Sequence, residues 1–343
     1  MIAVGGAPTS GLADPVTARF PAASPSRGHY ESFYLKAGHP TEALAVWIRY
    51  TVHKPPDAEP SGSVWFTLFD ARAGAPRASK VTVEADRIGT GGGDYVRIAD
   101  SRFGSGHVSG DATSERLAAS WELEFESGEE TLRHLPRDWM YRAPVPRTKL
   151  ESPHPATRFS GRVRVGDDLL ELDGWPGMVG HNWGSEHAER WIWMHATGFE
   201  GHGPETWLDV AIGRIRLGPF TTPWVANGVL SIDGARERLG GIERVRATAV
   251  EESPTGCRFV LPGREGSVRG SVTAPADALV GWLYADPQGP GHHTVNCSIA
   301  SMRLELRRPE APPVELATAS GATYELGMRE RDHGVPIQPF PDG

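Results

Sequence analysis

The chain has 343 residues, of which 39% are hydrophobic and 23% are charged, a composition that is typical of folded soluble proteins and excludes a disordered or fibrous chain. The net charge of −8, without any block of consecutive Lys and Arg residues, leaves no basic surface, so we expect no nucleic-acid partner. Two cysteines, Cys257 and Cys297, are too few for a disulfide framework. With no signal-peptide pattern near Met1 and no stretch of about 18 apolar residues, a cytoplasmic protein is expected.

Residues 1–28 are rich in Gly, Ala, Pro and Ser and lack a hydrophobic period, so they are expected to form a flexible N-terminal segment. After them, short runs of β-branched and aromatic residues alternate with Gly, Pro and Asp clusters, a pattern typical of antiparallel strands joined by tight turns. Alternating apolar and charged residues over 121–125 predict a strand with one face in solvent. The first set of predicted strands is 30–36, 43–52, 63–69, 80–84, 95–99, 102–108 and 118–125.

Five prolines lie between residues 135 and 155. Because proline has no backbone N–H to donate to a sheet, this segment is interpreted as a crossing between two domains. With almost no helical period, the chain is predicted to be all-β, with two antiparallel β-barrels or deep sandwiches over residues 29–150 and 151–343. The second set of predicted strands is 158–165, 168–172, 191–197, 206–215, 224–232, 245–251, 258–261, 267–274, 279–284, 293–306 and 322–328.

The densest group of large rings lies in residues 175–207, which hold five of the 11 tryptophans of the chain, with four histidines interleaved. Side chains two residues apart share a face of a strand, so Trp191, Trp193 and His195 are predicted to point the same way. We expect these rings to line the interior of a barrel.

Asp209 is a lone carboxylate on the next predicted strand, where its neighbours are apolar. Burying an unpaired charge costs several kcal/mol, so three states are open to it. Asp209 is exposed, or paired with a partner such as His181 or Arg214, or has a raised pKa and acts as an acid. His181 is itself predicted to share a strand face with Trp183.

A resemblance to a known family is carried by two neighbouring motifs, GHNWG at residues 180–184 and WIW at residues 191–193. They resemble the signature of the lipocalin-like superfamily that includes bacterial carotenoid 1,2-hydratases and plant tocopherol cyclases. Residues 284–298 resemble the carboxy-terminal part of those proteins, so the likeness covers mainly residues 150–306. The resemblance implies two lipocalin-like antiparallel β-barrel domains packed together, a long apolar pocket for an isoprenoid, and no metal or redox cofactor.

In the hydratases of this superfamily, an acidic residue on the strand after the second motif is the proposed proton donor. The resemblance places Asp209 at that position, with His181 and Trp183 at the matching positions of the first motif. The tyrosine expected shortly before the acid is absent, because Trp207 and Leu208 stand there.

Protonation of a C=C bond produces a carbocation, which requires a buried acid and walls that stabilise positive charge without attacking it. The face of a tryptophan stabilises a desolvated cation by about 2 kcal/mol. We therefore hypothesise a cofactor-independent enzyme that hydrates or cyclises an isoprenoid or polyene, in which Asp209 delivers the proton and His181 holds or reloads it. The residues expected to flank or bind the substrate are Trp183, Trp191, Trp193, Asn182, His195, Trp207 and Tyr34.

Two other functions stay open. The same barrel is compatible with a non-catalytic carrier of an isoprenoid or lipid, and with a pericyclic cyclase of a polyene. A carrier predicts Asp209 to be salt-bridged or exposed to solvent, whereas an enzyme predicts it to be buried and to point into the pocket. The expected partner is a hydrophobic small molecule, and transient contact with a membrane surface for substrate pickup is compatible with it. The pattern leaves the oligomeric state open.

Several of these residues also have purely structural interpretations. The tryptophans of the central stretch are equally suited to filling a barrel core. His181 and Asn182 are suited to satisfying backbone groups at a strand irregularity, and Glu31 to anchoring a loop to the core. The His and Glu residues of the stretch match no standard metal-site spacing, so no metal is expected. Stabilising a loop and a strand start is the role expected of His292, His293 and Asn296.

Overall fold

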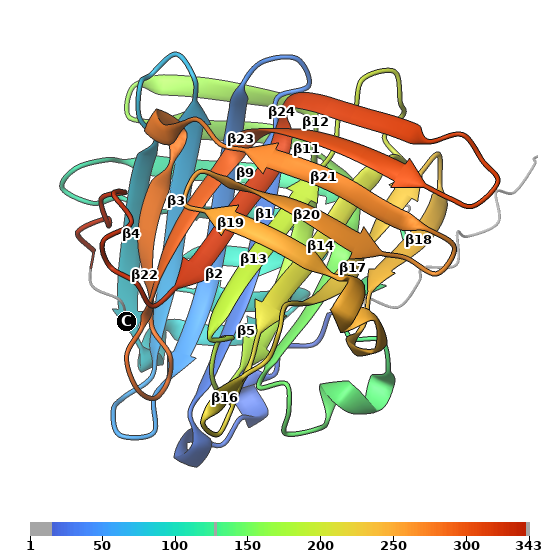
Figure 1. The fold of residues 1–343 in the computed structure, drawn as a ribbon. Helices are drawn as coiled ribbons and strands as arrows, with labels where there is room; N and C mark the ends of the chain where they lie inside the picture. The colour runs from blue at the N-terminus through green and yellow to red at the C-terminus, as the bar shows by residue number, and fades with distance from the viewer. Residues whose placement is uncertain (1–15, 127–128, 341–343) are drawn as a thin grey trace, which may run out of the picture.

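The computed structural model describes residues 16–126 and 129–340 and arranges their strands in two large antiparallel sheets (Figure 1). Within these ranges, the first sheet has 12 strands and forms a nearly closed barrel, and the second has 10 strands and forms a half-barrel. The prediction of an all-β fold with two barrel-like sheets packed together is confirmed. The helical segments are short 3-10 turns, and none in the described part of the chain is long and apolar enough to cross a membrane.

The first sheet has the strand order β4-β3-β2-β1-β12-β11-β9-β8-β7-β6-β5, with β10 beside β11. Most neighbours are consecutive in the chain because tight turns join them, whereas β1 pairs with β12. The strands are β1 (His29–Gly38), β2 (Leu44–Lys54), β3 (Ser61–Asp70), β4 (Arg77–Glu84), β5 (Ile88–Gly91), β6 (Asp94–Ile98), β7 (Ser101–Gly104), β8 (His107–Asp111), β9 (Ala119–Glu126), β10 (Leu132–Arg133), β11 (Thr148–Val165) and β12 (Asp168–Gly184).

The second sheet has the order β18-β17-β14-β13-β24-β23-β21-β20-β19, with β22 beside β23. A separate hairpin is formed by β15 (Arg216–Leu217) and β16 (Phe220–Thr221). The strands of the sheet are β13 (Arg190–Ala196), β14 (Trp207–Arg214), β17 (Val225–Ile232), β18 (Ala235–Gly240), β19 (Ala249–Ser253), β20 (Gly256–Pro262), β21 (Ser267–Thr273), β22 (Val280–Tyr284), β23 (His292–Arg307) and β24 (Val314–Met328). The 3-10 turns are η1 (Phe20–Ala22), η2 (Pro25–Arg27), η3 (Ala85–Arg87), η4 (Asp138–Tyr141), η5 (Ile242–Ala247) and η6 (Ala276–Ala278).

The chain passes from the first sheet to the second later than the proline-rich segment suggests. β11 pairs with β9 and β12, and β12 also pairs with β1, so both strands belong to the first sheet. The expected boundary at residue 150 therefore lies inside β11, and residues 185–189 connect the sheets. β11 accommodates Pro153 and Pro155 because its register with β12 shifts on both sides of His154, where the ladder is interrupted.

Residues 16–28 are packed onto the first barrel, which corrects the expectation of a flexible segment for this part. Val16 and Phe20 belong to the buried core of the barrel. The backbone N–H groups of Arg19 and Phe20 donate to the Glu31 carboxylate at 2.9 and 2.5 Å. A buried carboxylate needs such donors, so Glu31 anchors the segment to the core. The expectation for residues 1–15 falls outside the described residues.

Several predicted strands differ in detail from the structure. β11, β12 and β24 extend well beyond the predicted runs 158–165, 168–172 and 322–328, and β12 includes the GHNWG motif. The run 102–108 is divided into β7 and β8 by a turn at Gly106, whose φ of 76° is accessible to glycine at little cost. The run 245–251 begins in the turn η5 and becomes a strand only from β19 onward.

Each sheet has its own buried core, and aromatic packing joins the two. On β2, Val46 and Ile48 point into the first barrel, while Trp47 points to the second sheet. The Trp47 and Trp65 rings lie 6.4 and 5.0 Å from the ring of Trp282 on β22. The outer face of β2 and β3 is therefore covered by the second sheet, and burial of apolar surface holds the sheets together.

Candidate functional site

A pocket with a volume of about 490 Å³ lies between the two sheets. Its wall is contributed by β1, β2, β11 and β12 of the first sheet and by β13, β14, β17, β22 and β24 of the second. Tyr34, Trp191 and Trp193 are among its lining residues. We expected these rings inside a barrel, but the opposite face of β13, with Ile192 and Met194, fills the core of the second sheet. The tryptophans are consequently turned toward the first sheet.

A larger depression of about 750 Å³ lies over β19, β20, β21, β23 and β24. Its lining carries both basic and acidic side chains, as on the solvated face of an antiparallel sheet. We therefore take the smaller, aromatic pocket as the candidate site. The charged residues of the larger depression are Glu200, Glu251, Arg258, Arg269, Arg303, Glu305 and Glu315.

Two glycines allow rings of the pocket wall to pack directly on the backbone of the neighbouring strand. Tyr34 is the partner of Gly180 on β12, and a Cβ atom on Gly180 would lie 2.2 Å from Cζ of the Tyr34 ring. Trp191 is the partner of Gly327 on β24, where a Cβ atom would lie 2.2 Å from the indole. Tyr34 also meets Trp193 edge to face, with ring centroids 5.3 Å apart. These cross-strand pairs hold the rings in the pocket wall.

We expect Gly180→Ala to lower the free energy of unfolding by about 1–3 kcal/mol, because the added methyl group forces the Tyr34 ring to move. Ligand binding should weaken as well. Urea unfolding and titration with the fluorescent polyene cis-parinaric acid measure the two effects. Gly89→Ala is a matched control, since its Cβ atom would make ordinary contact with the Arg97 side chain. Wild-type stability and binding in Gly180→Ala would show that the glycine is dispensable.

Each of the two pocket tryptophans on β13 is held by a buried carboxylate. Trp193 Nε1 donates to Asp209 Oδ1 at 3.1 Å, and Trp191 Nε1 donates to Glu325 Oε1 at 3.0 Å. A hydrogen bond from the indole N–H to a carboxylate increases the electron density of the ring, whose face attracts cations. The wall therefore combines two aromatic faces with two acidic groups that are hydrogen-bonded to them, an arrangement suited to positive charge.

Asp209 also belongs to a hydrogen-bonded unit that joins the two sheets. Ser152 Oγ on β11 donates to Asp209 Oδ2 at 2.5 Å. His134 Nε2 lies 3.2 Å from Ser152 Oγ and 3.6 Å from Asp209 Oδ2. His134 Nδ1 lies 3.1 Å from the carbonyl oxygen of Asn227, which only accepts, so Nδ1 carries a proton. A proton taken up by the unit would reside on His134 Nε2 or, with the Ser152 hydroxyl reversed, on Asp209.

The pKa of Asp209 lies below its usual value. Burial by itself raises the pKa, but the charge and hydrogen bond of His134, the charge of His195 and the hydrogen bond of Ser152 outweigh it. Among the three states considered from the sequence, the structure shows the paired carboxylate, with His134 as the partner. A resting acid of raised pKa is therefore not the state of Asp209.

The unit meets the pocket through His134. His134 lines the pocket, whereas Asp209 lies behind the indole of Trp193, to which it is hydrogen-bonded. Asp209 is thus buried, as the enzyme hypothesis requires, but it is paired with His134, as the carrier hypothesis predicts, and it reaches the pocket only through its partners.

His181 and Trp183 lie on the face of β12 opposite the pocket. His181 is fully buried, with Nε2 2.7 Å from Glu31 Oε1 and Nδ1 3.3 Å from Glu151 Oε1. Its ring stacks between Phe33 and Trp183, with both centroid distances 4.5 Å. The expected grouping of His181 and Trp183 with the acid of β14 is not formed, because successive positions of a strand point to opposite faces.

The other predicted substrate-binding residues divide between the wall and the layer behind it. Asn182 lines the pocket, and its Oδ1 atom has no hydrogen-bond partner in the described part of the chain. His195 lies outside the lining and approaches Pro155 O with Nε2 at 2.9 Å, while burial lowers its pKa to about 4. Trp207 packs in a small buried cluster with Leu132, Ala156 and Val229.

Sequence inspection missed Glu325, Ser152 and His134. Glu325 lines the pocket and accepts hydrogen bonds from Tyr284 Oη at 3.1 Å and Asn296 Nδ2 at 3.2 Å. The signal that singled out Asp209, a lone carboxylate in an apolar strand, is present at Glu325 as well. Nothing in the local sequence distinguishes Ser152 and His134, because both are brought to Asp209 by contacts across the sheets.

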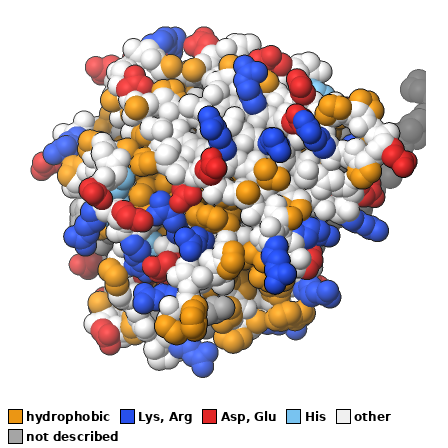
Figure 2. All heavy atoms as spheres, viewed as in Figure 1, with side chains coloured by type: hydrophobic (Ala, Val, Ile, Leu, Met, Phe, Trp, Pro, Cys, Tyr) orange, Lys and Arg blue, Asp and Glu red, His pale blue; other side chains and the backbone are white. Residues whose placement is uncertain are grey.

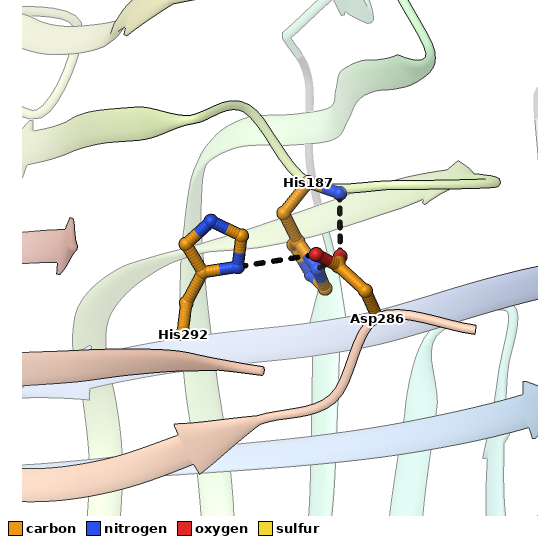
Figure 3. Close-up of side chains that lie close together, drawn as sticks. All are labelled: His187, Asp286 and His292. Carbon is orange, nitrogen blue, oxygen red and sulfur yellow. Dashed lines mark hydrogen bonds and ion pairs between the residues drawn. The ribbon is translucent and has the colours of Figure 1, made fainter. Parts of the chain in front are cut away.

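A polar group lies at the β22 end of the pocket (Figure 3). The backbone N and the Nδ1 of His187 each lie 2.7 Å from Asp286 Oδ1. His292 Nδ1 and Arg329 Nη2 each lie 3.4 Å from Asp286 Oδ2. Of this group, His187 lines the pocket.

The comparisons with known proteins concern the fold. No family model matches the chain. It is similar to an uncharacterized protein of Mycobacterium tuberculosis, in strain CDC 1551 / Oshkosh and in strain H37Rv, with 26% identity over 291 residues that cover 81% of this chain and 82% of the relative.

Three solved structures resemble the model. An AttH-like protein from Nitrosomonas europaea has a TM-score of 0.52 at 14% identity, covering 93% of this chain and 98% of that one. CghA with Sch210972 has a TM-score of 0.52 at 12% identity, covering 88% and 89%. Kievitone hydratase from Nectria haematococca has a TM-score of 0.53 at 11% identity, covering 92% and 94%. The chain therefore has the lipocalin-like barrel fold of these proteins, and the finer resemblance to carotenoid hydratases and tocopherol cyclases stays a prediction.

Proposed function

We propose that this protein is an enzyme that generates a cationic intermediate on an unsaturated apolar substrate and completes its hydration or cyclisation. The observation that carries the proposal is the pair of pocket tryptophans, Trp191 and Trp193, whose indole N–H groups are each bound by a buried carboxylate. Such a wall stabilises a developing positive charge more than it stabilises a neutral substrate, which is the requirement for catalysis. The name of kievitone hydratase, which has the same fold, adds support for this class of reaction.

The substrate class follows from the shape and lining of the pocket. A volume of about 490 Å³ with walls of Tyr34, Trp47 and the two β13 tryptophans is suited to an isoprenoid or polyene chain. The proton is supplied by the unit of Asp209, Ser152 and His134, with His134 at the pocket wall. The lowered pKa of Asp209 makes it the charge partner that keeps the shared proton available, rather than the group that holds it at rest.

Isotope uptake tests the reaction directly. Wild-type protein is incubated with geranylgeraniol, squalene or lycopene, which differ in chain length, in deuterated water enriched in ¹⁸O. Deuterium in a new C–H bond reports protonation of the C=C bond, and ¹⁸O in the product reports attack by water. Deuterium without ¹⁸O indicates cyclisation or isomerisation. If the compounds bind and take up neither isotope, the proposed activity is wrong: unchanged compounds then indicate a carrier, and rearranged compounds indicate a pericyclic cyclase.

Trp191→Leu is expected to weaken binding of decyltrimethylammonium by a factor of about 10–30, the effect of losing one desolvated cation–π contact. Binding of the neutral 1-decanol should change much less, because it gains only apolar contact from the indole. Isothermal titration calorimetry measures both affinities. Trp224→Leu, which alters a half-buried tryptophan outside the pocket lining, is the matched control. Equal weakening for the cation and the alcohol would contradict a cation-stabilising wall.

Exposed apolar side chains surround the pocket entrance and favour pickup of substrate from a membrane surface. Val145 and Ile242 line the pocket and are 45% and 61% exposed, and Phe220, on the adjoining hairpin, is 75% exposed. Figure 2 shows hydrophobic side chains along the lower edge of the view, where β16 lies in Figure 1. An exposed apolar patch beside an apolar pocket is typical of a lipid-contacting surface.

The double variant Phe220→Asp/Ile242→Asp should reduce flotation with phosphatidylcholine vesicles several-fold, because two charges replace apolar groups at the contact. Leu169→Asp is the matched control, since Leu169 is also exposed, at 45%, but lies on β12 outside the pocket lining. Equal flotation of the double variant and the wild type would exclude the entrance as the contact surface.

A further inference from the structure

His187 and Asp286 form a hydrogen-bonded pair at the edge of the pocket (Figure 3). They come from the two loops that precede β13 and β23. His187 Nδ1 and its backbone N both lie 2.7 Å from Asp286 Oδ1, so the carboxylate fixes the orientation of the ring. With the Nδ1 proton donated to Asp286, Nε2 is the basic atom of the neutral imidazole. Nε2 is buried and has no hydrogen-bond partner among the residues that the structure describes.

Aromatic packing holds the His187 ring in this position. The ring stacks on Tyr30 with a centroid distance of 4.0 Å and on Trp191 with a centroid distance of 5.3 Å. His187 therefore lies beside one of the two tryptophans that are suited to stabilising a cation. A base held this rigidly loses little entropy when it acts on a neighbouring group.

A small cavity adjoins the pocket at this point. Its volume is about 10 Å³, and Arg49, His187 and Tyr284 line both it and the pocket. Space of this size is about that required by one water molecule. Within residues 16–126 and 129–340, Thr51 Oγ1 and Trp65 Nε1, from the rest of its lining, are buried without a hydrogen-bond partner, as is His187 Nε2. Buried donors and acceptors of this kind are commonly satisfied by an ordered water.

We infer that His187, oriented by Asp286, is the general base that activates a water molecule held in this cavity. The inference rests on the proposed function and specifies its second step. The water oxygen forms a C–O bond with the cationic carbon in the pocket, and one water proton passes to His187 Nε2. The resulting imidazolium is stabilised by Asp286 and afterwards releases its proton to solvent. Together with the proton added in the first step, one water molecule is added across the C=C bond.

The same residues also have the donor atoms of a metal site, because those of His187, Asp286 and His292 all lie within 4.8 Å of one another. The hydrogen bonds favour the base. Asp286 Oδ1 already accepts the backbone and side-chain N–H groups of His187. Asp286 Oδ2 lies 3.4 Å from the guanidinium of Arg329, whose positive charge opposes a cation at this position.

His187→Gln separates the two steps of the reaction. In the isotope experiment, the variant should lose ¹⁸O uptake by a factor of about 100 or more, the usual contribution of a general base, and retain deuterium uptake near the wild-type level. His293→Gln is the matched control, because the His293 ring pairs with His333, at 2.9 Å, outside the pocket lining. Equal loss of both isotopes in His187→Gln, or unchanged ¹⁸O uptake, would overturn the inference. Absence of both isotopes from the wild type would instead overturn the proposed function together with this step.

A crystal structure and zinc titration give readouts that do not depend on turnover. We expect a water within hydrogen-bonding distance of His187 Nε2 in the wild type, and its loss or displacement in His187→Gln. Calorimetric titration with Zn²⁺ should show no binding that His187→Gln abolishes. A tight zinc site that depends on His187 would replace the base with a metal centre, and an Nε2 atom bonded to a protein group in place of water would also contradict the inference.

Discussion

Replacement of Asp209 by Asn is expected to lower the rate of substrate conversion by a factor of about 10²–10⁴, the usual contribution of general acid–base catalysis. An amide cannot take up the proton that Asp209, Ser152 and His134 share, so the unit loses its capacity to move that proton to the pocket. Substrate binding should persist, because Asp209 lies behind the Trp193 indole and outside the pocket lining. Mass spectrometry of the products measures the rate, and quenching of tryptophan fluorescence measures binding.

Two further variants show whether the carboxylate acts through its partners. Ser152→Ala keeps Asp209 but breaks its hydrogen-bonded link to His134, and it should also slow conversion. Asp168→Asn is the matched control, because Asp168 is exposed and pairs with Arg77 at 2.7 Å, far from the pocket lining. If Asp209→Asn converts substrate at the wild-type rate, the unit has no part in the reaction.

Replacement of Glu31 by Gln is expected to lower the free energy of unfolding by about 3–5 kcal/mol, the usual effect of removing one partner of a buried ion pair. Glu31 lies 2.7 Å from His181 and accepts the N–H groups of Arg19 and Phe20, whereas glutamine has no charge and has an NH2 group, which cannot accept, in place of one of the two oxygens. Urea unfolding measures the effect. Decyltrimethylammonium binding in the folded variant should remain, because Glu31 and His181 face the interior of the first barrel rather than the pocket.

The stability difference between wild type and Glu31→Gln is expected to depend on pH in both directions. Burial raises the pKa of Glu31, but hydrogen bonds from His181 and His29 outweigh it and lower the pKa from 4.5 to about 2. The contribution of ionised Glu31 to the free energy of unfolding is therefore present above pH 4.5 and lost as the pH falls toward 2. Burial lowers the pKa of His181, but Glu151 and Glu31 outweigh it and raise the pKa above 6.5.

The contribution of protonated His181 is fully present below pH 6.5 and is lost as the pH rises through its pKa in the folded protein. The difference between the two proteins should therefore be largest between pH 4.5 and 6.5. Urea unfolding from below pH 4.5 to above pH 6.5 checks the profile, with Glu124→Gln, at an exposed position of β9, as the matched control. A difference that does not vary with pH would show that the charges of Glu31 and His181 do not contribute to stability.

In the structure, the residues of the GHNWG motif lie on two opposite faces of β12. Its glycine and asparagine positions, Gly180 and Asn182, face the pocket, where one seats Tyr34 and the other presents a carbonyl oxygen. Its histidine and tryptophan positions, His181 and Trp183, face the interior of the first barrel and help to bury Glu31. A motif read as one catalytic group is therefore divided between the site and the core by the alternation of the strand.

Local patterns in the sequence determined which segments form strands and which side chains share a face. The pairing of Trp191 with Trp193, and of His181 with Trp183, follows from the period of two and is present in the structure. The isolation of a carboxylate in an apolar strand marked Asp209 as a residue that needs a partner. These features depend on neighbours within a few residues, which is the range over which the sequence alone carries structural information.

Only the tertiary structure decided which faces meet. His134, Ser152 and Asp209 come from separate segments, and their contacts arise from the packing of β11 against β14, which no local pattern specifies. The same packing placed the pocket between the sheets, because β13 uses one face for the core of its own sheet and has the other face, with its tryptophans, free to meet the first sheet. Strand formation is governed by short-range alternation, whereas the site depends on long-range packing and on the satisfaction of buried polar groups.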